Sequence, residues 1–211
     1  MRLRNIKGSR ESIQVSEYVI QDVNAKKGAW NQVFGNSNPI HIEIGMGKGK
    51  FIMELARNNP DINYIGIEKY SSVLIRAIEK RSQEELPNLC FIRMDAESIC
   101  DVFEKGEVKQ IYLNFSDPWP KEKHSKRRLT SKEFFARYDQ ILLEEGDVIF
   151  KTDNRELFDF SVEQIPLANW SIKNITYDLH NSNFAAGNIM TEYETKFVGE
   201  GKPIHRVVAY R

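Results

Sequence analysis

The sequence predicts an α/β fold: a three-layer sandwich whose mostly parallel sheet is closed by an antiparallel pair of C-terminal strands. Two observations support this prediction. From about residue 40, short β-branched runs alternate with segments whose apolar residues follow helical spacing. After about residue 166 the alternation stops, and two strand-like runs follow with no helical pattern between them. Because the 211 residues contain no internal repeat and no linker, we expect one domain over residues 1–211, with a basic N-terminal arm over about residues 1–28.

The elements are predicted from their periodicity and from the residues that begin or end them. The first strand is a β-branched run that ends in glycines, and the helix after it stops at Asn58-Asn59-Pro60. Thr130-x-x-Glu133 is a capping-box pattern, and it predicts a helix that Gly146 closes. The predicted strands are residues 40–44, 64–68, 89–94, 110–114, 147–151, 171–179 and 204–210. The predicted helices lie around residues 51–56, 73–78, 97–105, 133–142 and 155–166.

The composition excludes several classes of protein. Apolar residues make up 41% of the chain and aromatic residues 11%, which excludes a disordered protein. No apolar run exceeds four residues, and no apolar segment follows the N-terminal charges, so we expect no membrane span and no secretory signal. Two cysteines, Cys90 and Cys100, are too few for a disulfide framework or a four-ligand zinc site, and we expect no metal. We therefore expect a soluble cytoplasmic protein.

The charge is unevenly distributed along the chain. Thirty basic and thirty acidic residues cancel overall, which argues against a uniformly basic nucleic-acid-binding surface. Residues 1–10 and residues 121–128 nevertheless carry a net charge of +4 each, so the remaining 193 residues carry −8. The sequence therefore predicts two concentrated basic patches on an acidic body. The first candidate partner for such a patch is a phosphate backbone, and the alternative is a merely solvated face.

A glycine-rich loop follows the first predicted strand, in the order Glu43-Ile44-Gly45-Met46-Gly47-Lys48-Gly49. The loop lacks the GK[ST] ending of a phosphate-cradling loop. It also fails the dinucleotide pattern, because the third glycine would fall at Lys50. Ligands of such sheets bind beyond the carboxyl ends of the strands. The loop is therefore predicted to line a ligand site other than a dinucleotide site.

Four carboxylates end the first four predicted strands: Glu43, Glu68, Asp95 and Asp117. Glu43 precedes the glycine turn, where it would repel a pyrophosphate but would suit a cation. Glu68 lies 23 residues after Gly45, the usual place of an acid that binds both ribose hydroxyls. Asp95 can accept from an adenine amino group. Together they predict a nucleoside with positive charge, and S-adenosyl-L-methionine is the candidate cofactor.

The stretch Asn114-Phe115-Ser116-Asp117-Pro118-Trp119-Pro120-Lys121 is the most specific motif in the chain. Together with the E-x-G-x-G-x-G loop and the C-terminal Thr191-Glu192-Tyr193-Glu194, it resembles the bacterial tRNA (guanine-N7-)-methyltransferase family. The resemblance covers nearly the whole chain. It implies a Rossmann-like fold that uses S-adenosyl-L-methionine, and methyl transfer to N7 of a guanosine in the variable loop of tRNA.

The resemblance also implies roles for individual residues. The catalytic position is Asp117. The implied cofactor-binding residues are Glu43, Gly45, Gly47, Glu68, Asp95 and Asp117. The implied substrate-binding residues are Lys121, Asp153, Thr191, Glu192, Tyr193 and Glu194, and the implied RNA contacts are Lys123, His124, Ser125, Lys126, Arg127 and Arg128. From chemistry alone, we further expect Glu194 to accept from the N1–H and exocyclic amine of guanine, and Tyr193 to stack on a base.

Three other functions fit parts of the sequence. A methyltransferase acting on exocyclic amines uses similar D-P-P-W loops, and a non-catalytic RNA-binding subunit would also need the basic run. A Rossmann-type oxidoreductase is disfavoured by Glu43 and by the missing third glycine. The sequence carries no signal for an oligomeric state.

Overall fold

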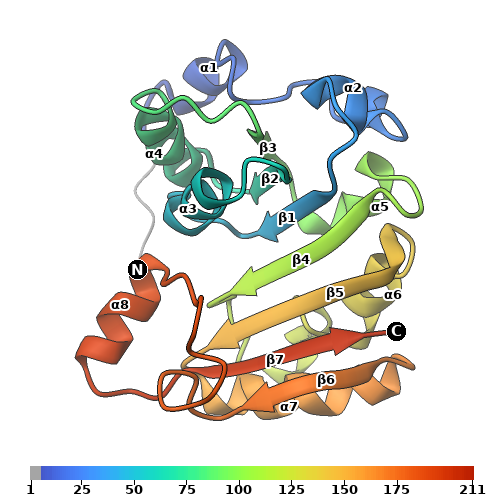
Figure 1. The fold of residues 1–211 in the computed structure, drawn as a ribbon, viewed down its shortest axis with the longest axis vertical. Helices are drawn as coiled ribbons and strands as arrows, with labels where there is room; N and C mark the ends of the chain where they lie inside the picture. The colour runs from blue at the N-terminus through green and yellow to red at the C-terminus, as the bar shows by residue number, and fades with distance from the viewer. Residues whose placement is uncertain (1–5) are drawn as a thin grey trace.

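The computed structural model describes residues 6–211 and confirms the predicted mostly parallel α/β sandwich (Figure 1). Its seven-stranded sheet has the order β3-β2-β1-β4-β5-β7-β6. The first five strands are parallel, and β7 pairs antiparallel with both β5 and β6. The strands are β1 (Ile40–Ile44), β2 (Asn63–Glu68), β3 (Leu89–Arg93), β4 (Val108–Asn114), β5 (Leu142–Thr152), β6 (Ser171–Thr176) and β7 (His205–Tyr210).

Helices cover both faces of the sheet (Figure 1). They are α1 (Ser9–Gln14), α2 (Trp30–Phe34), α3 (Lys50–Asn58), α4 (Ser71–Arg81), α5 (Ile99–Val102), α6 (Lys132–Tyr138), α7 (Arg155–Leu167) and α8 (Glu192–Gly199). Residues 6–211 also contain three short 3-10 helices: η1 (Asn24–Lys26), η2 (Ala96–Ser98) and η3 (Glu122–Arg127).

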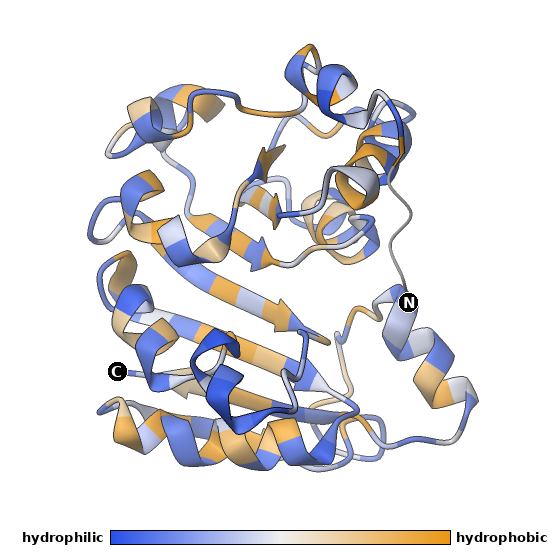
Figure 2. Ribbon diagram, turned by 180° about the vertical axis from the view of Figure 1, so that it is seen from behind, coloured by the Kyte–Doolittle hydropathy of each residue, from blue (hydrophilic) through white to orange (hydrophobic). Residues whose placement is uncertain are grey.

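The core consists of two apolar clusters, one on each side of the sheet. One cluster packs α2, α5, α6 and α7 against the strands, and the other packs α1, α3 and α4. In Figure 2 the central strands are largely orange, whereas the helices alternate between orange and blue. Strands buried on both faces are expected to be apolar throughout, and helices only on their inner face. The packing therefore follows the hydrophobic pattern of the sequence.

Residues 6–28 pack onto the domain instead of extending from it. Ile13 and Val19 are buried, and Phe91 of β3 exchanges backbone hydrogen bonds with Tyr18 and Ile20. This segment therefore protects the edge of the sheet at β3. Two of the four basic residues within residues 1–10, Arg2 and Arg4, lie outside the described residues.

The capping-box prediction at Thr130 is wrong in position. Helix α6 begins at Lys132, and its N-cap is Ser131, whose hydroxyl accepts from the Phe134 N–H. Thr130 instead pairs with the Ser161 hydroxyl at 2.6 Å. Gly146 does not end a helix but lies inside β5, where an added Cβ would lie 2.9 Å from the Leu143 carbonyl oxygen. Glycine is needed there because of close packing within the sheet.

One further helix ends earlier than predicted, and one helix was not predicted at all. The helix expected over residues 97–105 is split into η2 and α5 and ends at Val102. Helix α8 lies between the last two strands, where no helix was expected. The buried residue of α8 is a glutamate, Glu194. The sequence of α8 therefore has only a weak apolar stripe, and periodicity did not predict the helix. In residues 6–211, no helix has the length and apolar character needed to cross a bilayer.

The fold predicts that Gly66 in β2 tolerates no side chain. An added Cβ would overlap Met46 Sδ and would lie 3.0 Å from Phe91 Cδ1. We expect Gly66→Ala to lower the free energy of unfolding by about 1–3 kcal/mol, measured by urea denaturation, because overpacking displaces buried side chains. Gly199→Ala is the control, since a Cβ at Gly199 meets no atom within 4 Å. A Gly66→Ala protein as stable as wild type would contradict this packing.

Candidate active site

A cleft of about 1200 Å³ opens where the carboxyl ends of β1 to β5 meet. Its walls come from the loops after these strands and from Tyr193 and Phe197 of α8. Figure 1 shows α8 on the side of the sheet toward which the arrowheads of β1, β4 and β5 point. The strand order reverses between β1 and β4, which is the usual place of a ligand site in an open α/β sheet. The predicted site residues that line the cleft are Gly45, Gly47, Glu68, Asp95, Asp117, Asp153, Tyr193 and Arg127.

The glycine loop requires glycine for its backbone conformation. Gly45 and Gly47 have φ angles of 76° and 59°, in the left-handed region that residues with a Cβ rarely adopt. An added Cβ at either position would meet no protein atom within 4 Å. The loop therefore leaves open space beside its backbone, which allows a ligand to approach closely.

Glu68 is held in a fixed position at the end of β2. Its Oε2 accepts from the Gly47 N–H at 3.1 Å, and its Oε1 accepts from the Tyr70 N–H at 2.9 Å. Burial raises the pKa of Glu68, although these backbone hydrogen bonds oppose the shift. A carboxylate has about four lone-pair sites, so Glu68 keeps acceptor capacity for ligand hydroxyls.

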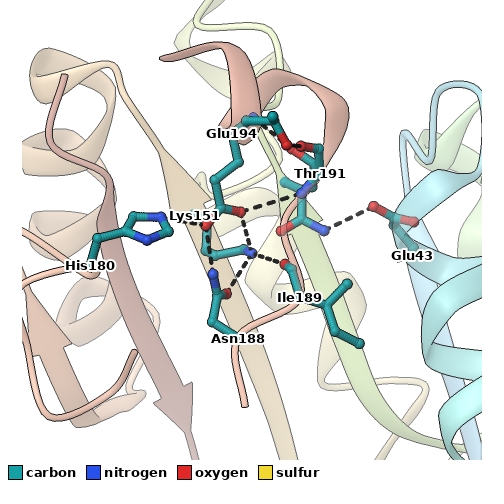
Figure 3. Close-up of polar contacts among 9 residues, drawn as sticks. Glu43, Lys151, His180, Asn188, Ile189, Thr191 and Glu194 are labelled. Atoms are coloured by element: carbon teal, nitrogen blue, oxygen red, sulfur yellow. Dashed lines mark hydrogen bonds and ion pairs between the residues drawn. The ribbon is translucent and has the colours of Figure 1, made fainter. Parts of the chain in front are cut away.

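Glu43 is buried beneath the glycine loop with one oxygen unsatisfied. Its Oε1 accepts from Asn114 Nδ2 at 2.8 Å, the contact drawn at Glu43 in Figure 3, and its Oε2 has no partner. Burial raises the pKa of Glu43 to about 8. Ser116 Oγ, in the loop after β4, is also buried without a partner. Such orphaned polar atoms are costly in a core, and they fit a ligand that carries hydrogen-bond donors and positive charge.

Asp95 and Lys69 form an ion pair at the rim of the cleft. Asp95 also accepts from the Glu97 N–H at 3.1 Å and so caps η2. Burial disfavours the charged carboxylate, but the ion pair with Lys69 and this N–H outweigh burial and lower the pKa of Asp95. Asp95 is therefore an ionised acceptor. In residues 6–211, no group of three or more His, Cys, Asp or Glu side chains is arranged to hold a metal ion.

The loop that carries Asp117 has a strained backbone. Phe115 and Trp119 have φ angles of 52° and 42°, and conformations of this kind cost about 1–3 kcal/mol each. Asp117 lies between them, exposed in the cleft. Pro118 and Pro120 restrict the backbone of this loop, but the sequence carries no signal for the strain. Strained residues of this kind cluster at functional sites.

The expected RNA-contacting run forms η3 at the rim of the cleft. Lys123, Lys126 and Arg127 are exposed, and the Arg127 guanidinium lies 5.1 Å from the centre of the Trp119 ring. Lys121 is exposed but does not line the cleft, whereas Ser125 and His124 are half-buried. Arg128 differs from the other basic residues, because its guanidinium donates to the backbone carbonyl oxygens of Pro118 and Trp119.

The segment from Thr191 to Glu194 begins helix α8. Thr191 and Glu194 form a reciprocal capping box. Tyr193 is 53% exposed and lines the cleft, as a base-stacking residue would. Glu192 does not line the cleft; it pairs with Lys48 at 3.0 Å and with Lys80 at 2.7 Å, and so connects α8 to the glycine loop and to α4.

Glu194 does not have the role that its chemistry suggested. It is fully buried, and Figure 3 shows its carboxylate surrounded by protein donors. Its Oε1 accepts from Asn188 Nδ2 at 2.7 Å and contacts His180 Nε2 at 2.9 Å, and its Oε2 accepts from Lys151 Nζ at 2.7 Å. The structure therefore contradicts the expectation that Glu194 binds the guanine edge directly, because both oxygens are occupied and shielded from the cleft.

Lys151, at the end of β5, is a residue that the sequence analysis missed. Its ammonium is buried and donates to Glu194 Oε2, to Asn188 Oδ1 at 3.0 Å and to the Ile189 carbonyl oxygen at 2.9 Å. Burial lowers the pKa of Lys151, and the contact with Glu194 opposes that shift. A lysine directly after the apolar run Val148-Ile149-Phe150 was the one available signal.

Comparison with known proteins identifies the family. A family model described as "Putative methyltransferase" matches residues 37–207. A tRNA (guanine-N7-)-methyltransferase of Lachnoclostridium phytofermentans is 66% identical over 211 residues, which cover 100% of this chain and 99% of that protein. One of a Geobacillus species is 50% identical, covering 98% of this chain and 94% of that protein. The chain belongs to the tRNA (guanine-N7-)-methyltransferase family.

Solved structures support the fold of this family member. An antibiotic-related methyltransferase superimposes with a TM-score of 0.66 at 20% identity, covering 98% of this chain and 99% of that one. The 16S rRNA methyltransferase KamB superimposes with a TM-score of 0.63 at 15% identity, covering 86% and 91%. At these identities the likeness concerns the fold alone.

We expect the buried Lys151–Glu194 pair to be essential for the stability of this methyltransferase. Lys151→Met leaves the Glu194 carboxylate buried without its counter-charge, so the free energy of unfolding falls by about 3–5 kcal/mol in urea denaturation. Arg76→Met is the control, because it breaks an exposed pair with Glu79 and costs less than about 1 kcal/mol. Equal losses in the two variants would contradict the buried network.

The raised pKa of Glu43 predicts a pH-dependent contribution to stability. A folded-state pKa of about 8 exceeds the usual value of 4.5, so the unfolded chain ionises at lower pH than the folded chain. The stability that Glu43 contributes relative to Glu43→Gln is therefore fully present below pH 4.5 and is lost as the pH rises toward 8. Denaturation of both proteins across this range measures the difference. A difference that stays constant with pH for Glu43→Gln would contradict the burial effect.

Proposed function

We propose that this chain transfers the methyl group of S-adenosyl-L-methionine to N7 of a guanosine in the variable loop of tRNA. Its relatives carry the name tRNA (guanine-N7-)-methyltransferase at full length. The structural observation that supports the proposal is one cleft that contains the carboxylates of Glu68, Asp95 and Asp117, with the cation Arg127 at its rim. Because tRNA is cytoplasmic, we place the reaction in the cytoplasm.

The residues fit a cationic nucleoside cofactor. S-adenosyl-L-methionine would supply an electrophilic methyl group on a sulfonium. Glu68 would accept from the ribose hydroxyls, and Asp95 would accept from the adenine amine. Gly45 and Gly47 would let the ligand approach the backbone. The unsatisfied Oε2 of Glu43 would compensate the positive charge of the ligand, which returns Glu43 toward its ionised form.

The chemistry at guanine requires placement more than a strong base. N7 has an in-plane lone pair, so no proton has to leave before the methyl group is transferred. The residues must align N7 with the methyl group, which is catalysis by proximity. Positive charge moves from the sulfonium to the purine ring during transfer, and the Asp117 carboxylate would stabilise it throughout.

Most of the remaining predicted residues have one of three proposed roles. Asp153 and Tyr193 line the cleft and would contact the guanosine. Lys121, Lys123, Lys126 and Arg127 are exposed and would bind tRNA phosphates. Thr191, Glu192 and Glu194 would act indirectly, by ordering the start of α8.

A transfer assay with labelled S-adenosyl-L-methionine, bulk tRNA and nucleoside analysis tests this function. We expect 7-methylguanosine as the product. We also expect Asp117→Asn to lower kcat on the order of 100-fold at saturating substrates, since one preorganised charge is lost. Asp61→Asn, an exposed turn residue before β2, is the matched control with unchanged kcat.

Three outcomes would contradict the proposal. A product methylated on an exocyclic amine would support the alternative methyltransferase reaction. No transfer by the wild-type chain would support a non-catalytic RNA-binding role. Wild-type turnover by Asp117→Asn would show that charge stabilisation at this position is not part of the mechanism.

A further inference from the structure

The loop that carries Asp117 is anchored to the fold at two places. At its start, the Phe115 N–H donates to the Lys151 carbonyl oxygen at 2.8 Å. At its end, Arg128 Nε donates to the Pro118 carbonyl oxygen at 3.0 Å, and Arg128 Nη2 donates to the Trp119 carbonyl oxygen at 3.2 Å. Within residues 6–211, the backbone of residues 116–120 makes no other hydrogen bond. Asp117 therefore lies between the two anchors.

The loop needs these anchors because its backbone is strained at both ends. The positive φ angles of Phe115 and Trp119 persist only where surrounding contacts enforce them. The prolines cannot contribute an N–H to hold the loop. Without Arg128, the C-terminal half of the loop would be free to relax, and the position of the Asp117 carboxylate would change.

Arg128 is itself held rigidly. Its guanidinium lies 4.2 Å from the centre of the Phe160 ring on α7. The backbone of Arg128 is also hydrogen-bonded. Its backbone N–H donates to the Ser125 carbonyl oxygen, and its carbonyl oxygen accepts from the Ser131 N–H, both at 3.0 Å. A planar guanidinium presents several donors in fixed directions and can bind two carbonyl oxygens at once, which the single ammonium of lysine reproduces poorly.

We propose that Arg128 is a positioning residue that holds Asp117 in the cleft, and that it is not a ligand of tRNA phosphate. The role assigned to Asp117 rests on the proposed function. The contrast with its neighbours supports the assignment: Lys126 and Arg127 are exposed, whereas Arg128 is half-buried and directs its guanidinium to the loop backbone. The basic run thus combines exposed cations with one half-buried arginine. We call the contact of Arg128 with the Pro118 and Trp119 carbonyl oxygens the clamp.

Tryptophan fluorescence tests the clamp without tRNA or cofactor. Of the three tryptophans, Trp30 and Trp170 are buried, so quenching by neutral acrylamide reports mainly on Trp119. We expect Arg128→Gln and Arg128→Lys to increase the acrylamide quenching slope, and Trp119→Phe to abolish that increase. Lys132→Gln removes an exposed charge nearby and should leave the slope unchanged. A wild-type slope in both Arg128 variants would overturn the clamp.

Kinetics distinguish positioning from phosphate binding. Arg128→Lys keeps the charge but not the two-carbonyl geometry, so we expect kcat at saturating tRNA to fall about 10- to 100-fold, the scale of a misplaced catalytic group. The salt dependence of tRNA binding should stay at the wild-type slope in Arg128→Gln. Wild-type kcat in Arg128→Lys, or a slope reduced by about one in Arg128→Gln, would show a phosphate contact instead. If the wild-type chain transfers no methyl group, the proposed function fails, and the quenching result still decides the clamp.

Discussion

The buried ion pair between Lys151 and Glu194 connects the two parts of the molecule that form the cleft. Lys151 belongs to the parallel sheet, and Glu194 belongs to the first turn of α8. All three ammonium protons of Lys151 have acceptors, and each oxygen of Glu194 has more than one partner. Burying two charges is costly unless every polar atom is satisfied. The network therefore permits one docked position of α8, with Tyr193 and Phe197 toward the cleft.

The acids in and beneath the cleft are less completely compensated than this network. Glu43 is buried with an unsatisfied oxygen and a raised pKa, and Glu68 is buried with a raised pKa. Burial without a counter-charge favours the neutral form of a carboxyl group. A cationic ligand would add favourable charge near these carboxylates, whereas a pyrophosphate would not. The electrostatics of the site thus support the same cofactor class as the pattern of acids in the sequence.

A short segment with concentrated positive charge lies beside this acidic cleft. Helix η3 follows the Asp117 loop directly, so its exposed cations lie next to the loop that carries Asp117. The same segment also stabilises the loop, through Arg128 on two carbonyl oxygens and Arg127 over Trp119. The same basic run therefore contains residues that contact the Asp117 loop and residues that are exposed at the rim of the cleft.

The sequence by itself determined the parallel strands, the order of their helices and the four acids at the strand ends. These features depend on local alternation, on glycines and prolines, and on the rule that parallel strands end at one edge. Only the tertiary structure decided the role of Lys151, of Glu194 and of Arg128. Lys151 and Glu194 are 43 residues apart, and Glu192 reaches Lys48 across 144 residues. Helix α8 also required the structure, because it is held by this buried charge network and has little apolar periodicity of its own. The sequence alone does not tell whether a charged side chain is solvated or buried. That depends on which distant groups the fold brings within hydrogen-bond distance of it.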